Sequence, residues 1–373
     1  ATTIWTSSNP IPSRWKPGWD EMMRVCGAVT VNDYGDTMTN LIRSNDDANF
    51  PWLGALIGSA IIGFWYWCTD QFIVQRVLSG KNEMEARRGT IFGAYLKLLP
   101  VFLFLIPGMI AFALHQKYIG AGGEGFLPML ANGTANADAA FPTLVAKLLP
   151  AGVKGLVVCG ILAALMSSLA SLFNSSAMLF TIDFYKRFRP ETPEKKLVGI
   201  GQVATVVIVI LGILWIPIMR SVGDVLYTYL QDVQSVLAPG IAAAFLLGIC
   251  WKRTSAQGGM WGLIAGMVIG LTRLGAKVYY SNAGEVADST FKYLFYDMNW
   301  LFFCGWMFLF CIIVVIVVSL ATKAPTAEKI QGLVFGTATK EQKAATRASW
   351  NHWDIIHTVI ILAITGAFYW YFW

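Results

Sequence analysis

The sequence predicts an all-α integral membrane protein. Hydrophobic residues make up 56% of the 373 residues, charged residues make up 13%, and the mean hydropathy is +0.56. Soluble domains carry about a quarter charged residues, so this composition indicates a chain that crosses the membrane several times. Apolar windows of membrane length recur along the chain, and a helix satisfies its own backbone hydrogen bonds in lipid.

Eight windows of about 20 mainly apolar residues predict eight transmembrane helices. We expect three parts: a polar segment over 1–50, five spans within 51–253, and three spans within 254–373, where 323–352 forms a charged loop. The windows are 52–76, 90–115, 155–182, 197–219, 223–249, 257–276, 300–321 and 355–373.

Basic residues mark one side of the membrane. Of the 28 Lys and Arg residues, 16 lie in four loops that alternate with the windows, and positive loops stay in the cytoplasm. The segment 1–50 is therefore expected to be extracellular and the loop 323–352 cytoplasmic. Because these residues do not follow one face, the charge of +6 does not indicate nucleic-acid binding. The 16 residues are Arg76, Lys81, Arg87, Arg88, Lys186, Arg187, Arg189, Lys195, Lys196, Lys252, Arg253, Lys323, Lys329, Lys340, Lys343 and Arg347.

A polar segment on the outer face, as expected for 1–50, needs a preceding signal peptide or transmembrane helix to be translocated. It has no signal-peptide pattern, and the chain begins with Ala1 rather than methionine. We therefore expect this chain to be the later part of a longer protein, whose N-terminal helices pack with it in the bilayer.

Polar residues inside the apolar windows predict a solute path, because polar groups at membrane depth are costly unless they face a wet cavity. The first window contains Trp-Tyr-Trp-Cys-Thr-Asp-Gln at 65–71, and later windows contain Lys97 and Gln231. Tyr66 and Trp67 could form an apolar platform beside hydrogen-bonding groups, or simply core residues. Lys97 lies about 10 Å from its window's start and could also snorkel to the surface.

The third window has a pattern suited to a cation. Spacing of three and four places Ala164, Ser167, Ser168 and Ser171 on one helical stripe. Adjacent hydroxyls and a freed backbone carbonyl could supply oxygen ligands to a hard monovalent cation. Close helix packing, with serine hydroxyls bonded to backbone carbonyls, explains the same pattern equally well.

The fifth window predicts a break at Pro239. Gln231, Asp232, Gln234 and Ser235 precede this proline, and a helix break in a membrane frees backbone groups that need polar partners. A polar cluster at such a break indicates a cavity rather than a lipid-facing surface.

Several motifs resemble the sodium/glucose cotransporter branch of the sodium:solute symporters. They are WYWCTDQ running on to VQR at 65–76, GAYLKL at 93–98, SSLAS at 167–171, FTIDFY at 180–185, and PGIAA through WKR at 239–253. The resemblance implies a LeuT-type inverted-repeat fold, in which 51–253 forms the second repeat and three peripheral helices follow.

The resemblance also implies roles at a sugar site. Tyr66 would be a substrate-binding inner gate, Trp67 a wall of the pocket, and Lys97 and Gln231 hydrogen-bond partners of sugar hydroxyls. This chain departs from the family where a threonine of the sugar site is replaced by Gln234, and Asp232 is also unusual. The identity of the sugar is therefore open.

For sodium, the resemblance implies ligation by the Ala164 carbonyl and the Ser167 and Ser168 hydroxyls, with Na⁺ as a co-transported ion. The implied function is sodium-coupled symport of a glucose- or galactose-like hexose across the plasma membrane, or the inner membrane of a bacterium. Symport of inositol or another polyol, and a sugar-gated sensor or ion conductor, remain open.

An enzyme is not expected. His115, His352 and His357 lie at the ends of windows, with no acid or nucleophile pattern around them.

Overall fold

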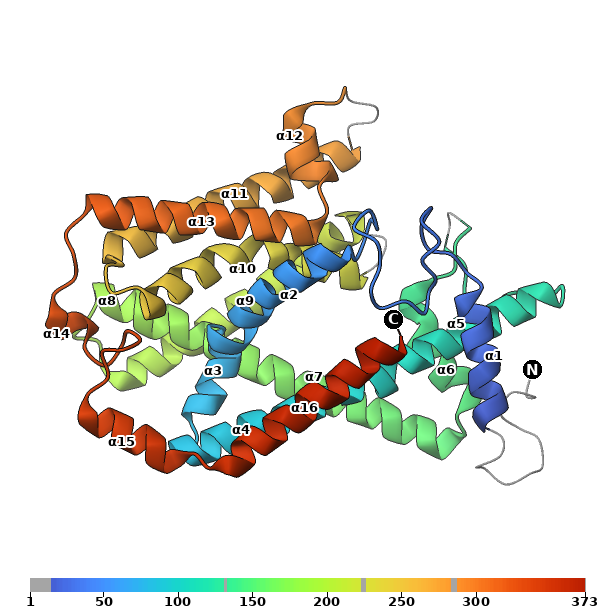
Figure 1. Cartoon of the computed structure of the whole chain (residues 1–373), viewed down its shortest axis with the longest axis horizontal. Helices are drawn as coiled ribbons and strands as arrows, with labels where there is room; N and C mark the ends of the chain where they lie inside the picture. Colours follow the sequence, from blue (N-terminus) through green and yellow to red (C-terminus); the bar gives the residue numbers. More distant parts are fainter. Residues whose placement is uncertain (1–14, 131–132, 223–225, 283–286, 373) are drawn as a thin grey trace. The chain divides into compact units, whose positions relative to one another are not determined.

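The computed structural model describes residues 15–130, 133–222, 226–282 and 287–372, and is drawn in Figure 1. Within these ranges the chain is helical, and its extended pairings are limited to isolated β-bridges. The all-α prediction is confirmed. The chain forms two compact units, the first from Ala1–Leu56, Lys81–Lys154 and Lys343–Trp373, the second from Ile57–Gly80 and Gly155–Gln342.

Among the residues that the structure describes, seven helices are long and apolar enough to cross a membrane, and a bent helix pair would make an eighth span. Each falls on one of the eight windows. The seven are Glu83–Gly120, Ala151–Phe188, Glu194–Pro217, Tyr229–Cys250, Ala256–Ser281, Trp300–Ala321 and His352–Tyr371, and the bent pair is Trp52–Cys68 with Gln71–Leu78.

The bent pair consists of α2 (Trp52–Cys68) and α3 (Gln71–Leu78), which meet at 49°. The Thr69 hydroxyl donates to the Trp65 carbonyl at the end of α2. Asp70 has an extended backbone, and its carboxylate accepts the Phe72 N–H as the N-cap of α3. The polar residues of the 65–71 motif therefore cause the bend.

Three helices of the second unit form its core: α10 (Leu226–Cys250), α11 (Ala256–Asn282) and α13 (Trp300–Ala321). Glycines recur every fourth residue along α11, at 258, 262, 266 and 270, and so share one face. A Cβ added to Gly266 would lie 2.9 Å from the Gly240 Cα atom, and one added to Gly262 would lie 2.3 Å from the Val315 side chain. Only glycine allows these backbones to approach so closely.

The break expected at Pro239 is absent, because α10 continues as a helix through this residue. Pro239 is fully buried, and Gly240 beside it contacts α11. Packing against neighbouring helices lets a membrane helix keep its course at a proline. Pro239 therefore belongs to the core of the bundle.

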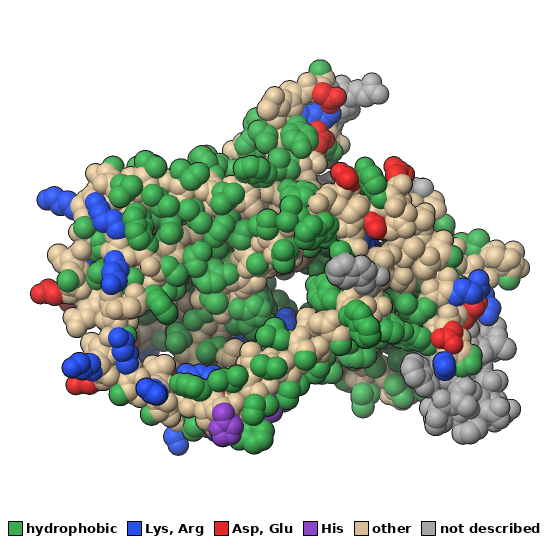
Figure 2. Space-filling model, viewed as in Figure 1, with side chains coloured by type: hydrophobic (Ala, Val, Ile, Leu, Met, Phe, Trp, Pro, Cys, Tyr) green, Lys and Arg blue, Asp and Glu red, His purple; other side chains and the backbone are tan. Residues whose placement is uncertain are grey.

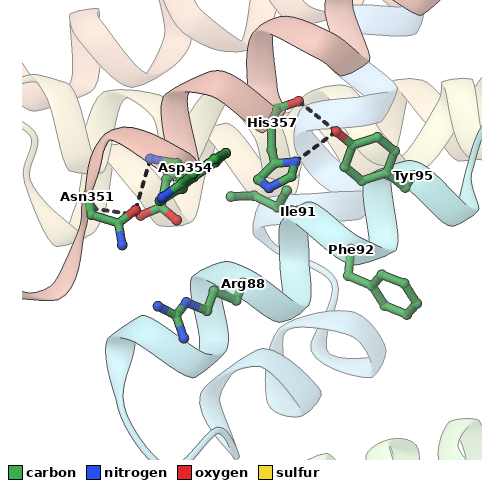
Figure 3. Close-up of a pocket in the computed structure, with 8 residues that line it drawn as sticks. Arg88, Ile91, Phe92, Tyr95, Asn351, Asp354 and His357 are labelled. Carbon is green, nitrogen blue, oxygen red and sulfur yellow. Dashed lines mark hydrogen bonds between the residues drawn. The ribbon is translucent and has the colours of Figure 1, made fainter.

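In the first unit, α16 (His352–Tyr371) packs against α4 (Glu83–Leu96). The Tyr95 hydroxyl lies 3.0 Å from Nδ1 of His357, and Arg87 lies 3.7 Å from the Asp354 carboxylate. Figure 3 shows Tyr95 and His357 pointing toward each other from the two helices. Polar pairs therefore fix the register of α16 on α4.

The same unit contains α1 (Trp15–Gly27), a helix within the segment 1–50, and α5 (Ile106–Gly120). Met22 and Cys26 of α1 pack against Met109 and Ala113 of α5. At 1.5 Å per residue α1 is only about 20 Å long, too short to cross the hydrocarbon core. Within residues 15–50, the described part of this segment, no helix is long enough to cross the bilayer.

The other helical segments of the described chain lie between these helices in the sequence. They are a π-helical turn (Val101–Leu105), a 3₁₀ turn (Ala137–Ala139), α6 (Ala140–Leu148), α7 (Ala151–Met178), a π-helical turn (Leu179–Tyr185), α8 (Lys186–Phe188), α9 (Glu194–Val222), α12 (Thr290–Lys292), a π-helical turn (Tyr293–Asp297), α14 (Ala327–Ile330) and α15 (Lys340–Ser349). The last two lie in the loop 323–352, which is therefore partly helical.

Large apolar surfaces remain uncovered. The membrane-length windows of Ala151–Phe188 and His352–Tyr371 contain no buried residue, and Leu156 and Met166 of α7 are 74% and 71% exposed. Figure 2 shows hydrophobic side chains over the visible faces of α11 and α13 as well. Surfaces of this extent need lipid or further helices against them.

We expect Gly266→Leu to disrupt the α10–α11–α13 bundle, because the new side chain would meet the Gly240 backbone. Overpacking of this kind costs about 1–3 kcal/mol or more. Thermal unfolding of the purified protein in detergent measures the loss. Gly259→Leu is the matched control, since an added Cβ there meets nothing within 4 Å. Equal melting temperatures for the two variants would contradict the packing role of Gly266.

Candidate functional site

Two aromatic side chains of the predicted solute site lie together in the last turn of α2. The rings of Tyr66 and Trp67 are 5.4 Å apart and nearly perpendicular, at 89°. Tyr66 is partly buried and Trp67 is 41% exposed. Asp70, which the sequence placed beside them as a hydrogen-bonding group, instead uses its carboxylate to cap α3. The aromatic pair thus ends one helix, and the acid begins the next.

Helix α3 is hydrogen-bonded to two serines of α7: Ser171 of the predicted stripe, and Ser175 one turn further along the helix. The Gln75 amide donates to the Ser175 hydroxyl at 2.6 Å, and Arg76 donates to the Ser171 hydroxyl. Ser175 in turn donates to the Ser171 carbonyl at 2.8 Å, and Ser171 to the Ser167 carbonyl at 3.1 Å. At Ser171 and Ser175 the serine hydroxyls therefore bond to backbone carbonyls and to a neighbouring helix, which is the packing role that the sequence analysis gives as an alternative to cation binding.

The three predicted sodium ligands lie on the same helix, one turn and more before these bonds. Ala164, Ser167 and Ser168 are all exposed, and α7 is unbroken across them. No helix break frees the Ala164 carbonyl, so a cation would have to use the second lone pair of its oxygen. Among the residues that the structure describes, the Ser167 and Ser168 hydroxyls form no hydrogen bond. Their oxygens are open to a ligand.

Gln231 lies on α10 and is partly buried, as is Gln234 one turn later. Asp232, between them, has its carboxylate on α11: one oxygen lies 3.4 Å from Arg273, and the other 2.5 Å from Lys277. The unusual acid in this segment is therefore part of an ion cluster between helices.

Lys97 follows α4 as its C-cap and is exposed. Its backbone N–H donates to the carbonyls of Gly93 and Ala94. Lys97 belongs to the first unit, whereas the other predicted site residues belong to the second. Its role as a solute ligand remains a prediction.

Sequence reasoning missed two polar arrangements. Arg273 and Lys277 lie four residues apart at the C-terminal end of the predicted window 257–276, and this pair of cations could have indicated a buried acid partner. The Tyr95–His357 pair lies beside a cavity of about 330 Å³, shown in Figure 3, whose lining includes Arg88, Phe92 and Trp353. None of the predicted site residues lines this cavity.

The described residues contain no cluster of three or more His, Cys, Asp or Glu side chains that could hold a metal ion.

Comparisons with known proteins agree with one another. The profile of the Sodium:solute symporter family matches residues 18–266. A sodium/mannose cotransporter of Bos taurus is 36% identical over 345 residues, 89% of this chain and 58% of that protein. Sodium/myo-inositol cotransporter 2 of Homo sapiens is 38% identical over 300 residues, 80% of this chain and 44% of that protein.

A third relative is sodium/glucose cotransporter 4 of Homo sapiens, 39% identical over 304 residues, 80% of this chain and 44% of that protein. The chain thus spans about half the length of the curated relatives it matches.

We expect Ser175→Ala to lower the melting temperature of the purified protein, because the change removes the acceptor of the Gln75 amide at a buried position. An unsatisfied buried donor costs about 1–3 kcal/mol. Ser176→Ala, one residue further along α7, is the control, since no hydrogen bond of the Ser176 side chain occurs in the described structure. If the two variants melt at the same temperature, the α3–α7 bond does not stabilise the fold.

Proposed function

Because the chain belongs to the sodium:solute symporter family, we propose that the full-length protein couples sodium entry to the uptake of a hexose or an inositol-like polyol by alternating access. The observation that carries this proposal is the match, at 36–39% identity, to relatives named as mannose, myo-inositol and glucose cotransporters. The chain is a multi-pass membrane protein of a transporter family and not an enzyme.

In this proposal the chain supplies the second inverted repeat and three peripheral helices in the plasma membrane. The segment 1–50 faces the outside and the loop 323–352 faces the cytoplasm. The uncovered surface of α7 supports a further set of helices against it, since its membrane-length window contains no buried residue. The remaining repeat of the protein is the proposed partner at that surface.

Sodium binds to the Ala164 carbonyl and the Ser167 and Ser168 hydroxyls. Two features support this site: the hydroxyls lack partners within the described residues, and they lie on an apolar helix where an unpaired hydroxyl is costly. Oxygen ligands of this kind suit a hard cation.

The solute binds beside Tyr66 and Trp67, with Gln231 and Lys97 as hydrogen-bond partners of its hydroxyls. An amide offers donors and an acceptor, and an ammonium offers three donors, which together match a ring of hydroxyl groups. Gln234 is one turn beyond Gln231 and replaces a hydroxyl side chain with a longer amide, so it bears on which sugar or polyol is accepted.

Coupling requires that sodium bind one conformation more tightly than the other, since a ligand with equal affinity for both shifts nothing. The bonds from Gln75 to Ser175 and from Arg76 to Ser171 support a direct link, because α3 begins four residues after Trp67 and α7 carries the sodium ligands. Movement of α7 would thus be transmitted to the turn beside the gate residue Tyr66.

Uptake of labelled solutes by the full-length protein, across a panel of hexoses and myo-inositol, tests this proposal. Ser168→Ala is expected to raise the sodium concentration for half-maximal uptake about tenfold, the loss of about 1.4 kcal/mol of ligation. Gln231→Ala is expected to raise the KM for solute by a similar factor, with little change in sodium dependence.

Ser176→Ala on the same helix serves as the control. Wild-type kinetics in both the Ser168 and Gln231 variants would contradict the assigned sites. A solute-evoked current without accumulation would identify a sensor or ion conductor in place of a symporter.

A further inference from the structure

We infer that Asp232 is a positioning residue for solute binding: its ion pairs with α11 fix the rotation of α10 about its own axis, and so present Gln231 and Gln234 on the face opposite α11. The inference rests on the proposed function, in which Gln231 binds the solute. It concerns how that side chain is held.

The contact between α10 and α11 follows one stripe of α10. Residues four apart on a helix lie on the same side, and 232, 236 and 240 all face α11. The two helices run antiparallel, so that rising numbers on α10 meet falling numbers on α11. The contacts in order are Asp232 with Lys277 and Arg273, Val236 with Gly270, and Gly240 with Gly266.

The glycine contacts set the distance between the helices. The Val236 side chain fills the groove at Gly270, whereas no side chain projects between Gly240 and Gly266, so van der Waals packing resists rotation of α10 mainly around Val236. Charged contacts elsewhere on the stripe add directional bonds to this packing.

The cation partner of Asp232 is itself held firmly. Arg273 is fully buried, donates to the Met298 carbonyl at 2.8 Å, and places its guanidinium 4.0 Å from the centre of the Phe303 ring. Its remaining long contacts are to the Leu294 carbonyl and to Asp232, each at 3.4 Å. The position of the Arg273 side chain is thus fixed by contacts other than its ion pair with Asp232.

Both oxygens of the Asp232 carboxylate are used, one on Arg273 and the other on Lys277. A direct role for this carboxylate as a solute ligand would require breaking these ion pairs and would leave the fully buried Arg273 without its counter-charge. Removing the carboxylate would leave two cations close together without their counter-charge. The acid therefore acts on α10 and not on the solute.

Helical geometry places the two glutamines away from this contact. With about 100° per residue, Gln231 lies about 140° and Gln234 about 160° from the centre of the stripe. Both are partly buried. A rotation of about 20° would displace the end of a side chain by about 2 Å, and smaller errors than this weaken binding and turnover substantially.

The test is a double-mutant cycle in the full-length protein, with sodium-dependent uptake of the best solute from the panel as the readout. Asp232→Asn and Lys277→Met are each expected to raise the solute KM about tenfold. The double variant should raise it about tenfold rather than about a hundredfold, because both changes remove the same constraint. Maximal uptake per transporter and sodium half-saturation should stay within about twofold, and Asp232→Glu should recover most of the affinity.

Asp232→Asn leaves the buried Arg273 poorly compensated and could prevent folding. Lys277→Met keeps the inference testable in that event, since the Lys277 side chain is 24% exposed. Its loss removes the shorter ion pair of Asp232, at 2.5 Å, which holds the carboxylate in position, while the longer contact at 3.4 Å still compensates the charge of Arg273.

Gln231→Ala in the same assay separates the two claims. A raised KM for Gln231→Ala with unchanged KM values for Asp232→Asn and Lys277→Met would overturn the inference and leave the proposed function intact. Multiplicative effects of the two charge variants would also overturn it. An unchanged KM for Gln231→Ala would overturn the proposed solute site and the inference with it.

Discussion

Membrane depth provides no water to satisfy a polar group, and this constraint orders the structure around its few polar side chains. Where such a group lies within a span, the protein supplies its partner: Asp232 with Arg273 and Lys277, Gln75 with Ser175, Tyr95 with His357. Groups that lack a partner in the described chain, such as the Ser167 and Ser168 hydroxyls, then become candidates for ligands from outside it.

The same constraint explains the helix packing. Apolar side chains gain little by leaving lipid for a helix interface, so close contact between backbones is the main source of attraction. The glycine stripe of α11 permits that contact with α10 and α13. The ion cluster of Asp232, Arg273 and Lys277 lies beyond the glycine contacts and adds directional bonds to this packing. Close backbone packing and polar bonds thus both hold α10 against α11.

Much of the fold could be predicted from the sequence. Apolar windows of membrane length are a strong signal, and all eight coincide with helices or the bent pair. The polar residues that bend the first span, Thr69 and Asp70, are visible as an interruption in it. The prediction of a helix break at Pro239 is wrong, because the sequence shows the missing N–H donor but not the contact of Gly240 with α11 beside it.

The candidate site divides in the same way. Residues within one segment, such as Tyr66 with Trp67 or Ser167 with Ser168, could be grouped from spacing alone. The partner of Asp232 could not, because Arg273 lies 41 residues away and Lys277 further still. Asp232 is unusual when the sequence is set beside the family pattern, but the sequence does not show that its carboxylate pairs with two cations of α11. Likewise, the bonds from α3 to α7 join residues 95 and 100 positions apart.

We propose that polar groups of these helices bind sodium and a hydroxyl-rich solute at the same time. The most direct measurement is the melting temperature of the purified full-length protein in sodium, potassium and choline salts of equal ionic strength, with and without solute. A ligand that binds the native state raises its stability. Sodium alone is expected to raise the melting temperature, and the solute is expected to raise it further only when sodium is present. Identical melting in all three salts, or a solute effect that ignores sodium, would contradict it.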